Sequence, residues 1–178
     1  SHTRMHSPQS MQRSLMIYAQ TDPLASINRF KYKIALPAPS LYGQFKHLVS
    51  ASQVLEGLLK MGFDDVFEVA EGADIVTRAI RERMRGMGRD RYPVISSACP
   101  AIVRLIRVRF PELIPHIIDV RQPMEVAAMV ARREFCRAHD ANPEEVGCFF
   151  ITPCAAKVTA IRNPIGHEPS AVDGAISM

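Results

Sequence analysis

Val94-Ile95-Ser96-Ser97-Ala98-Cys99-Pro100-Ala101-Ile102 is the stretch around which the chain can be interpreted. Apolar residues lead there into a turn of small side chains that carries a thiol. The pattern predicts a buried strand over residues 92–96 and a helix that starts at the proline, where a missing N–H costs nothing. A second stretch has the same form: Phe149-Phe150-Ile151-Thr152-Pro153-Cys154-Ala155-Ala156-Lys157. Each predicted strand end therefore carries one cysteine beside a proline.

Strand and helix patterns alternate along the rest of the chain. Further strands are predicted over 32–36, 65–69, 147–152 and 172–177, and helices over 50–61, 72–86, 100–110 and 123–138. This alternation predicts an α/β fold with a largely parallel sheet flanked by helices. Asp74 is expected to cap the helix that follows Gly72. The expected inward-facing residues of the last two helices are Ile102, Val103, Ile106 and Phe110, and Met124, Ala127, Met129 and Val130.

Three short segments each follow a predicted strand and so share one expected location. In parallel sheets, ligands bind outside the carboxyl ends of the strands. We therefore expect the three segments to converge on one edge of the sheet. They are Ala38-Pro39-Ser40, Ala98-Cys99-Pro100 and Pro153-Cys154-Ala155-Ala156-Lys157.

The length and charge of the chain limit the classes of protein to consider. The 178 residues predict one domain or a large lobe of one, with residues 1–30 as an N-terminal arm or linker that holds a short helix near 11–19, and 31–178 as the lobe. The net charge of +4 comes from arginines in helical stretches. Solvated helix faces account for them, and no nucleic-acid partner is expected. No apolar run is long enough to cross a membrane and no secretory signal is present, so we expect a cytoplasmic protein.

The four cysteines are Cys99, Cys136, Cys148 and Cys154, and none forms a CxxC pair. This spacing argues against a disulfide framework and leaves metal ligand, reactive thiol or buried core residue as interpretations. Cys136 and Cys148 lie beside phenylalanines and are interpreted as small core residues. Two thiolates could hold part of an iron–sulfur cluster or a zinc ion, but either takes four ligands. Spacing alone would make Cys99 and Cys154 core residues too.

A resemblance to a known protein family favours a ligand role over a core role for Cys99 and Cys154. From Ala38 to Ser177 the chain resembles the first lobe of the catalytic domain of [FeFe]-hydrogenases, one lobe of the iron-only hydrogenase large-subunit fold. Ser96–Pro100 resembles the family's Thr-Ser-Cys-Cys-Pro signature, and Thr152–Lys157 resembles its Met-Pro-Cys-x-x-Lys signature. Other matches, in order and at similar spacing, are Ala38-Pro39-Ser40, Lys60-Met61-Gly62-Phe63, Gly72-Ala73-Asp74, Phe110-Pro111-Glu112-Leu113 and Val172-Asp173-Gly174-Ala175.

The resemblance implies a cofactor and the residues that would hold it. The family's active site is a [4Fe–4S] cluster joined through a cysteine sulfur to a two-iron unit that carries CO and cyanide. Cys99 and Cys154 would be two of the four cluster ligands. Lys157 would place its ammonium against a cyanide, and Ser40, after Pro39, would offer a hydroxyl and backbone contacts on the cyanide side. Ala98 and Pro153 belong to the same two signatures.

Several departures from the family pattern concern proton transfer. The cysteine that relays protons in the family is Ala98 here, and a methyl group cannot carry a proton. Thr152 replaces the methionine of the second signature, and Ala160 replaces a glutamate. Ile80 and Arg83 lie near the positions of the proton-route glutamates, with Glu82 as a misplaced candidate. The branch of the family with alanine at the relay position is regarded as sensory, and this sequence resembles that branch.

The resemblance also implies that a further lobe belongs to the protein. The remaining two cluster cysteines of the family lie downstream of Met178, and ferredoxin-like or signalling domains accompany this lobe. We therefore expect the isolated chain to bind no cluster, to be inactive, to expose apolar surface, and to form homodimers by edge pairing or by swapping of the N-terminal arm. The leading hypothesis is part of a hydrogen or redox sensor. The alternatives are a lobe of a working hydrogenase with another proton route, and a thiol or zinc module unrelated to hydrogen.

Overall fold

The computed structural model describes residues 27–45, 49–165 and 169–178. The predicted N-terminal helix near 11–19 and most of the predicted arm or linker lie outside these residues. None of the described helices is long and apolar enough to cross a lipid bilayer.

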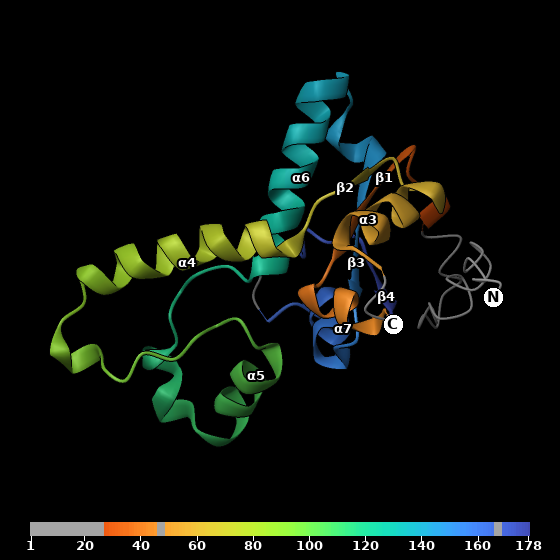
Figure 1. The fold of residues 1–178 in the computed structure, drawn as a ribbon. Coiled ribbons are helices and arrows are strands. Elements are labelled where there is room, and N and C mark those ends of the chain that lie inside the picture. Colours follow the sequence, from red (N-terminus) through yellow and green to blue (C-terminus); the bar gives the residue numbers. More distant parts are fainter. Residues whose placement is uncertain (1–26, 46–48, 166–168) are drawn as a thin grey trace.

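A four-stranded parallel sheet forms the centre of the fold (Figure 1). Its strands are β1 (Tyr32–Pro37), β2 (Asp65–Val66), β3 (Val146–Thr152) and β4 (Gly174–Ser177), in the order β2-β1-β3-β4. Every pairing is parallel, and β1 lies against β3 from Tyr32↔Val146 to Pro37↔Ile151. The α/β class and the parallel sheet are confirmed. The second strand is shorter than the predicted 65–69 because helix formation begins at Val69.

The two central strands are buried on both faces, as expected for a parallel sheet covered by helices. All seven residues of β3 are buried. Phe150 and Cys148 face a core with Ala127, Ala128 and Phe135 of the long helix α6, whereas Phe149 and Ile151 face Val54 and Leu58 of helix α3. This alternation follows from the period of two residues along a strand.

Helices connect the strands and cover the sheet. They are α3 (Ala51–Lys60), α4 (Val69–Arg85), α5 (Pro100–Arg109), α6 (Pro123–His139) and α7 (Ala155–Arg162), with 3₁₀ turns at η1 (Pro39–Gln44), η2 (Arg89–Arg91), η3 (Pro111–His116) and η4 (Pro143–Glu145). The helix α3 begins at a capping box in which the Ser50 side chain accepts from the Gln53 N–H and the Gln53 side chain accepts from the Ser50 N–H.

The first half of α4 crosses α6 closely because Gly72 lacks a side chain. A Cβ at this position would lie 2.5 Å from the Pro123 carbonyl oxygen and 2.9 Å from the Ala127 Cβ. The helix starts at Val69, not after Gly72, so the prediction that Asp74 caps it is wrong. Asp74 lies within the helix and is exposed.

The predicted strand over 92–96 is also wrong. Ile95 forms one isolated parallel bridge with Ile117 and does not join the sheet. The preceding helix has 17 residues, so it carries the chain about 25 Å along its axis. We call residues 75–122, which extend away from the sheet in Figure 1, the arginine-rich segment. Within this segment, Ile95 pairs with Ile117 and with no strand of the sheet.

The inward-facing predictions are confirmed for some residues and wrong for others. Met124 and Ala127 of α6 are buried, as are Val103 and Ile106 of α5. Met129, Ile102 and Phe110 are exposed by 45–46%. They are exposed because α6 and α5 each bury one side only.

Candidate functional site

The carboxyl ends of β1 and β3 meet and form one edge of the candidate site. The Ala38 N–H donates to the Ile151 carbonyl at 3.0 Å, which joins the chain just beyond β1 to the end of β3. Pro39 and Ser40 follow in η1 and are exposed, and Pro153 follows β3 and is exposed. The expectation that these two segments converge at one edge is therefore confirmed.

Cys154 lies directly beyond the buried end of β3. It is the N-cap residue of α7, and it is half-buried. Its N–H is held by the Thr152 hydroxyl, at 3.2 Å, and Thr152 is only 2% exposed. Cys154 therefore lies beside the N–H groups of the first turn of α7, which have no hydrogen-bond partner within the helix.

Lys157 lies in the first turn of α7, three residues after Cys154. Its Nζ is 5.4 Å from the centroid of the Phe150 ring, and the side chain is half-buried. Phe150 is completely buried in β3. A cation over an aromatic face is stabilised there while its N–H donors stay available. The sheet therefore positions this ammonium group near the β3 carboxyl end.

Cys99 has the same local setting on a different element. It is the N-cap residue of α5, with Pro100 at the first helical position, and it is exposed. The Ser96 hydroxyl accepts from the Ala98 N–H at 3.3 Å, and the Ser97 hydroxyl donates to the Val120 carbonyl at 2.7 Å. The turn is therefore held by its own serines and not by a strand of the sheet.

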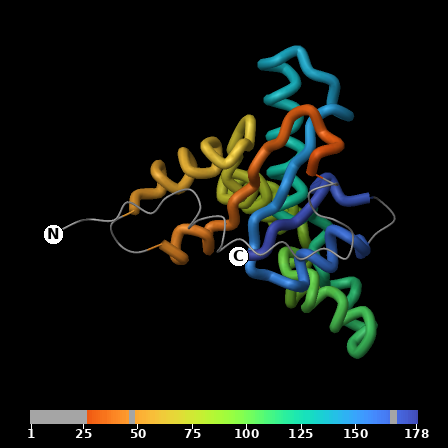
Figure 2. The backbone as a smooth tube through the Cα atoms, turned by 90° about the vertical axis from the view of Figure 1, so that its right-hand side faces the viewer, coloured from red at the N-terminus to blue at the C-terminus, as the bar shows by residue number. Residues whose placement is uncertain are grey.

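Packing of α5 against α7 brings the two cysteine-bearing helices together (Figures 1 and 2). The Arg107 side chain donates to the Ile165 carbonyl at 2.7 Å, and Arg104 donates to the Asn163 carbonyl. Both carbonyls lie just beyond the end of α7. Two arginine side chains therefore attach the segment with Cys99 to the chain beyond α7, whereas a strand of the sheet was expected to hold this segment.

The side chains present match half of an iron–sulfur ligand set. Among the described residues, no three His, Cys, Asp or Glu side chains lie together as a group that could hold a metal ion. Two thiols at helix N-caps and a neighbouring cation are the kinds of group that a thiolate-bound cluster uses, but a [4Fe–4S] cluster takes four thiolates. The two thiols therefore fit such a cluster in kind, and they number two where the cluster takes four.

The other two cysteines lie on the α6 side of the sheet. Cys148 in β3 is completely buried and donates weakly to the Ala128 carbonyl, and Cys136 of α6 packs partly buried against the same core. Burial raises the pKa of the Cys148 thiol to about 12. Both residues occupy the core positions that were predicted for them.

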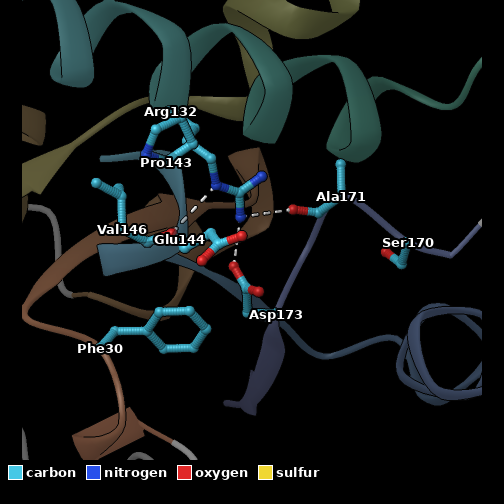
Figure 3. A pocket seen from close by; sticks show the side chains of 8 residues that line it. All are labelled: Phe30, Arg132, Pro143, Glu144, Val146, Ser170, Ala171 and Asp173. Atoms are coloured by element: carbon cyan, nitrogen blue, oxygen red, sulfur yellow. Dashed lines mark hydrogen bonds and ion pairs between the residues drawn. The ribbon is translucent and has the colours of Figure 1, made fainter. Parts of the chain in front are cut away.

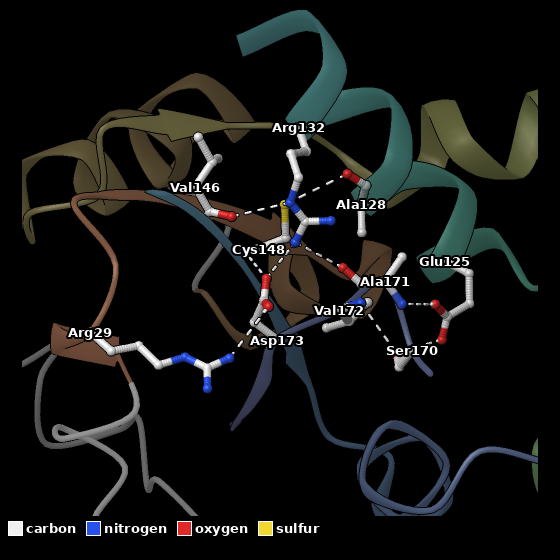
Figure 4. Close-up of polar contacts among 10 residues, drawn as sticks. All are labelled: Arg29, Glu125, Ala128, Arg132, Val146, Cys148, Ser170, Ala171, Val172 and Asp173. Carbon is white, nitrogen blue, oxygen red and sulfur yellow. Dashed lines mark hydrogen bonds and ion pairs between the residues drawn. The ribbon is translucent and has the colours of Figure 1, made fainter. Parts of the chain in front are cut away.

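A polar cluster that the sequence analysis did not identify lies at the opposite end of the sheet (Figure 4). Arg132 donates to the Val146 and Ala171 carbonyls, both at 3.1 Å, and to the Asp173 carboxylate. The same carboxylate accepts from the Cys148 N–H at 2.8 Å, and Arg29 lies 3.7 Å away. Asp173 is part of a motif that resembles the family, but only the fold shows that its carboxylate joins α6, β3 and the start of β4.

This cluster borders a shallow hollow of about 290 Å³ (Figure 3). Phe30, Pro143 and Glu144 form its other walls. Val146 is the first residue of β3, so the hollow lies at the amino end of the strands, away from Cys154. Because Asp173 already neutralises Arg132, the arrangement serves the fold and does not offer a free cation.

A second unpredicted contact does lie at the carboxyl edge. The Tyr42 hydroxyl in η1 donates to the Glu68 carboxylate, and Glu68 precedes α4. Burial, followed by this hydrogen bond, raises the pKa of the Tyr42 hydroxyl. The bond ties the turn that carries Ser40 to the start of α4. No sequence pattern marks this pair, because its residues are 26 positions apart.

Relatives of known activity share part of this chain. Iron hydrogenase 1 of Clostridium pasteurianum is 24% identical over 136 residues, which cover 71% of this chain and 24% of that protein. The cytosolic Fe-S cluster assembly factor NAR1 homolog of Schizosaccharomyces japonicus is 31% identical over 77 residues, 43% of this chain and 15% of that protein. The chain thus spans a quarter or less of the length of these relatives.

Solved structures confirm the fold. A variant of the [FeFe]-hydrogenase HydA1 from Chlamydomonas reinhardtii matches with a TM-score of 0.69 at 21% identity, over 86% of this chain and 43% of that one. A structure described as showing stepwise H-cluster assembly in a hydrogenase matches with a TM-score of 0.62 at 22% identity, with the same coverage.

The family itself follows from a match that covers most of the chain. Residues 31–178 match the family described as the iron only hydrogenase large subunit, C-terminal domain. The match includes both cysteine-bearing turns, the whole sheet and the helices that cover it. The chain therefore belongs to the family formed by the C-terminal domain of iron-only hydrogenase large subunits.

Proposed function

We propose that residues 31–178 are the lobe of an iron-only hydrogenase-like protein that supplies two thiolate ligands to an iron–sulfur H-cluster. One observation carries the proposal. Cys99 and Cys154 each occupy the N-cap position of a helix, and the two helices, α5 and α7, pack together. Cys99 is exposed and Cys154 is half-buried, so neither thiol is enclosed by that packing.

Each neighbouring residue has a role in this proposal. Lys157 would donate to an anionic cyanide of the cofactor, steadied by the Phe150 ring. Ser40 would donate its hydroxyl on the same side, with Pro39, Ala98 and Pro153 shaping the surrounding backbone. Thr152 holds the Cys154 N–H and so fixes the direction of the thiol. The bound group would supply a redox-active iron centre that the chain alone lacks.

We further propose that the whole protein senses hydrogen or redox state. Ala98 stands where the family has its proton-relay cysteine, and a methyl group cannot exchange a proton with the cofactor. Slow proton delivery suits a sensor, because the cofactor then persists in a defined state. The remaining part of the domain would complete the ligand set, and ferredoxin-like or signalling domains would receive the signal.

The ligand proposal is tested in the full-length protein, reconstituted with iron and sulfide. Cys99→Ser and Cys154→Ser are each expected to lose the cluster signal in EPR and most of the bound iron. Cys136→Ser is the matched control, because Cys136 packs against the α6 core, and it is expected to keep both. Unchanged iron content in Cys99→Ser and Cys154→Ser would disprove the assignment.

The isolated chain provides a separate test. With two thiolates in place of four, it is expected to hold no stoichiometric [4Fe–4S] cluster after the same reconstitution. One cluster per chain, by iron and sulfide assay, would contradict this expectation. One tightly held zinc ion per chain would instead support a zinc-binding module.

The sensory role is tested by restoring the missing thiol. Hydrogen evolution by the full-length protein is expected to be slow and to rise about a hundredfold in Ala98→Cys, which is the scale of general acid–base catalysis. Ala98→Ser adds bulk and a hydroxyl without a thiol and serves as the control. Wild-type evolution as fast as that of Ala98→Cys would refute sensing and favour a working hydrogenase with another proton route.

The similarity to NAR1 proteins favours a second candidate, a role in iron–sulfur cluster assembly. This candidate also needs no proton relay. The two roles differ in their response to hydrogen. A sensor's reconstituted cluster is expected to change its EPR or infrared spectrum under hydrogen gas, whereas an assembly factor's cluster should not change under hydrogen but should transfer to an apo-ferredoxin.

A further inference from the structure

We propose that the arginine-rich segment, residues 75–122, is a docking surface for an acidic, amphipathic helix of a partner protein. The surface comprises the outer face of α5 and its surroundings, and it involves no cofactor. Three observations support it: an apolar helix face that points into solvent, an uneven distribution of charge, and the presence of arginine in place of lysine.

The helix α5 carries apolar side chains on both its inner and its outer face. Val103 and Ile106 are buried, at 8% and 5% exposure, and they hold the helix on the fold. Beyond this buried face, Ile102, Leu105 and Val108 are 45%, 48% and 77% exposed. The apolar surface of α5 thus extends beyond the face that it buries, between the side chains of Arg104, Arg107 and Arg109. The outer face therefore has the character of an interface.

Exposed apolar residues are concentrated in this part of the molecule. Seven of the ten large apolar side chains that are exposed in the described part of the chain fall within residues 75–122. Two of them are aromatic. The seven are Ile75, Tyr92, Ile102, Leu105, Val108, Phe110 and Ile114. Contiguous exposed apolar surface is characteristic of interaction sites, and Ile102, Leu105 and Val108 follow one another at three-residue spacing along α5.

The same segment carries all of the chain's excess positive charge. Residues 75–122 contain ten arginines and four acidic residues, a net charge of +6, so the rest of the chain carries −2 of the total of +4. Nine of these arginines are exposed, and only Arg104 is half-buried. A partner that covers the apolar face must therefore also bring carboxylates or another anionic group.

The type of cation indicates a protein partner. All ten basic residues of the segment are arginines and none is lysine. Arginine and aromatic residues are enriched in protein interfaces, where lysine is depleted, and arginine pairs with carboxylates in a two-pronged geometry. Nucleic-acid surfaces are more polar than this one. A second copy of the segment would place +6 against +6, so self-association through it is disfavoured.

The test uses a synthetic peptide of about five helical turns, with leucines along one face and glutamates on the other, and a matched peptide with lysines in place of the glutamates. The chain is titrated with each peptide, with binding followed by fluorescence anisotropy and the site mapped by NMR. The leucine–glutamate peptide is expected to bind saturably, to perturb the amides of α5, and to bind at least tenfold more tightly than the lysine version.

Matched variants locate the binding surface. Leu105→Ser is expected to weaken peptide binding about tenfold, the scale of one interface anchor. Leu59→Ser removes an equally exposed leucine, at 45%, from α3 and is expected to change nothing. Arg109→Gln is expected to weaken binding, whereas Arg133→Gln on α6 is not. All four positions are exposed, so each variant should fold, which circular dichroism checks.

Several outcomes would overturn the proposal. They are the absence of saturable binding, equal binding of the two peptides, or insensitivity to Leu105→Ser. Tighter binding of a DNA duplex, or of phosphatidylglycerol vesicles, would assign the surface to nucleic acid or membrane. A concentration-dependent dimer that Val108→Ser abolishes would assign it to a second copy. Binding that is present in the chain but lost in the full-length protein would assign it to the remainder of the same protein.

Discussion

The two cysteine-bearing turns have the same sequence pattern but different surroundings. At residues 149–154 an apolar run forms the end of β3, a fully buried strand with β1 on one side and β4 on the other. At residues 94–99 a similar run forms one isolated bridge, between Ile95 and Ile117. Both runs then turn into a helix capped by the cysteine. The cap and helix are thus local properties, whereas a strand also requires that the chain be brought alongside another strand.

The difference extends to the regions that carry the two turns. Around the sheet, strands and helices share two cores with side chains such as Phe150 and Leu58 almost fully buried. In the arginine-rich segment, large apolar side chains remain exposed, and its links to α7 are made by Arg104 and Arg107. The sheet region therefore accounts for most of the folding free energy, while the segment contributes surface chemistry.

Truncating one phenylalanine in each region tests most directly whether the two regions contribute differently to stability. Phe150→Ala is expected to lower the free energy of unfolding by about 3–5 kcal/mol, because it leaves a cavity in the centre of the sheet. Phe110→Ala, at 45% exposure, is expected to cost less than about 1 kcal/mol. Urea unfolding followed by circular dichroism gives both values. Equal losses would mean that the segment holds a core of its own.

A second comparison removes one carboxylate from an ion pair in each region. Asp173→Ala is expected to cost about 2–3 kcal/mol, because it leaves the Cys148 N–H without this acceptor and the largely buried Arg132 without its carboxylate partner. Asp119→Ala removes the partner of Arg83, and since Asp119 is 97% exposed the cost should stay below about 0.5 kcal/mol. Thermal unfolding measures the two shifts. A similar drop in Tm for both would contradict the assignment of Arg132 and Asp173 to the fold.

The smallest expected effect is the pH dependence that the buried Cys148 thiol gives to stability. Burial raises the Cys148 pKa from 9.0 to about 12, so the folded chain keeps a proton that the unfolded chain loses above pH 9. Stability from this group is complete below pH 9 and is lost as pH rises towards 12. Between pH 8 and 10 the wild type should lose about 1 kcal/mol more than Cys148→Ala.

The sequence predicted those parts of the fold that depend on local capping and turn patterns and on the apolar patterns of strands and helices. Four of the five expected strands are present in the sheet, and the helices from Ala51, Pro100 and Pro123 begin within one residue of their predicted starts. Ser50 illustrates why, since its capping box is complete within four residues. The placement of Cys154 and Ser40 at adjacent strand ends followed from the parallel arrangement.

What the sequence could not predict depends on contacts between distant residues. The failure at 92–96 arose because the 17 residues of α4 carry the chain away from the sheet before that run begins. Gly72 looked like a helix start, but it is a crossing point with α6, which only the packing reveals. The Tyr42–Glu68 and Arg132–Asp173 contacts join residues 26 and 41 positions apart, and no periodic pattern marks them.

The Asp173 carboxylate has a consequence for strand alignment. The edge strand β4 has only four residues, and in a parallel pair nothing like a hairpin turn fixes which residue lies opposite which. A slip by one position would send Ser177 into the space now filled by Ile176. Asp173 lies one residue before β4 and accepts from the Cys148 N–H on β3. This hydrogen bond therefore fixes the register of the short strand β4 against β3. In that register Ser177 lies opposite Thr152, the last residue of β3 before the turn that carries Cys154.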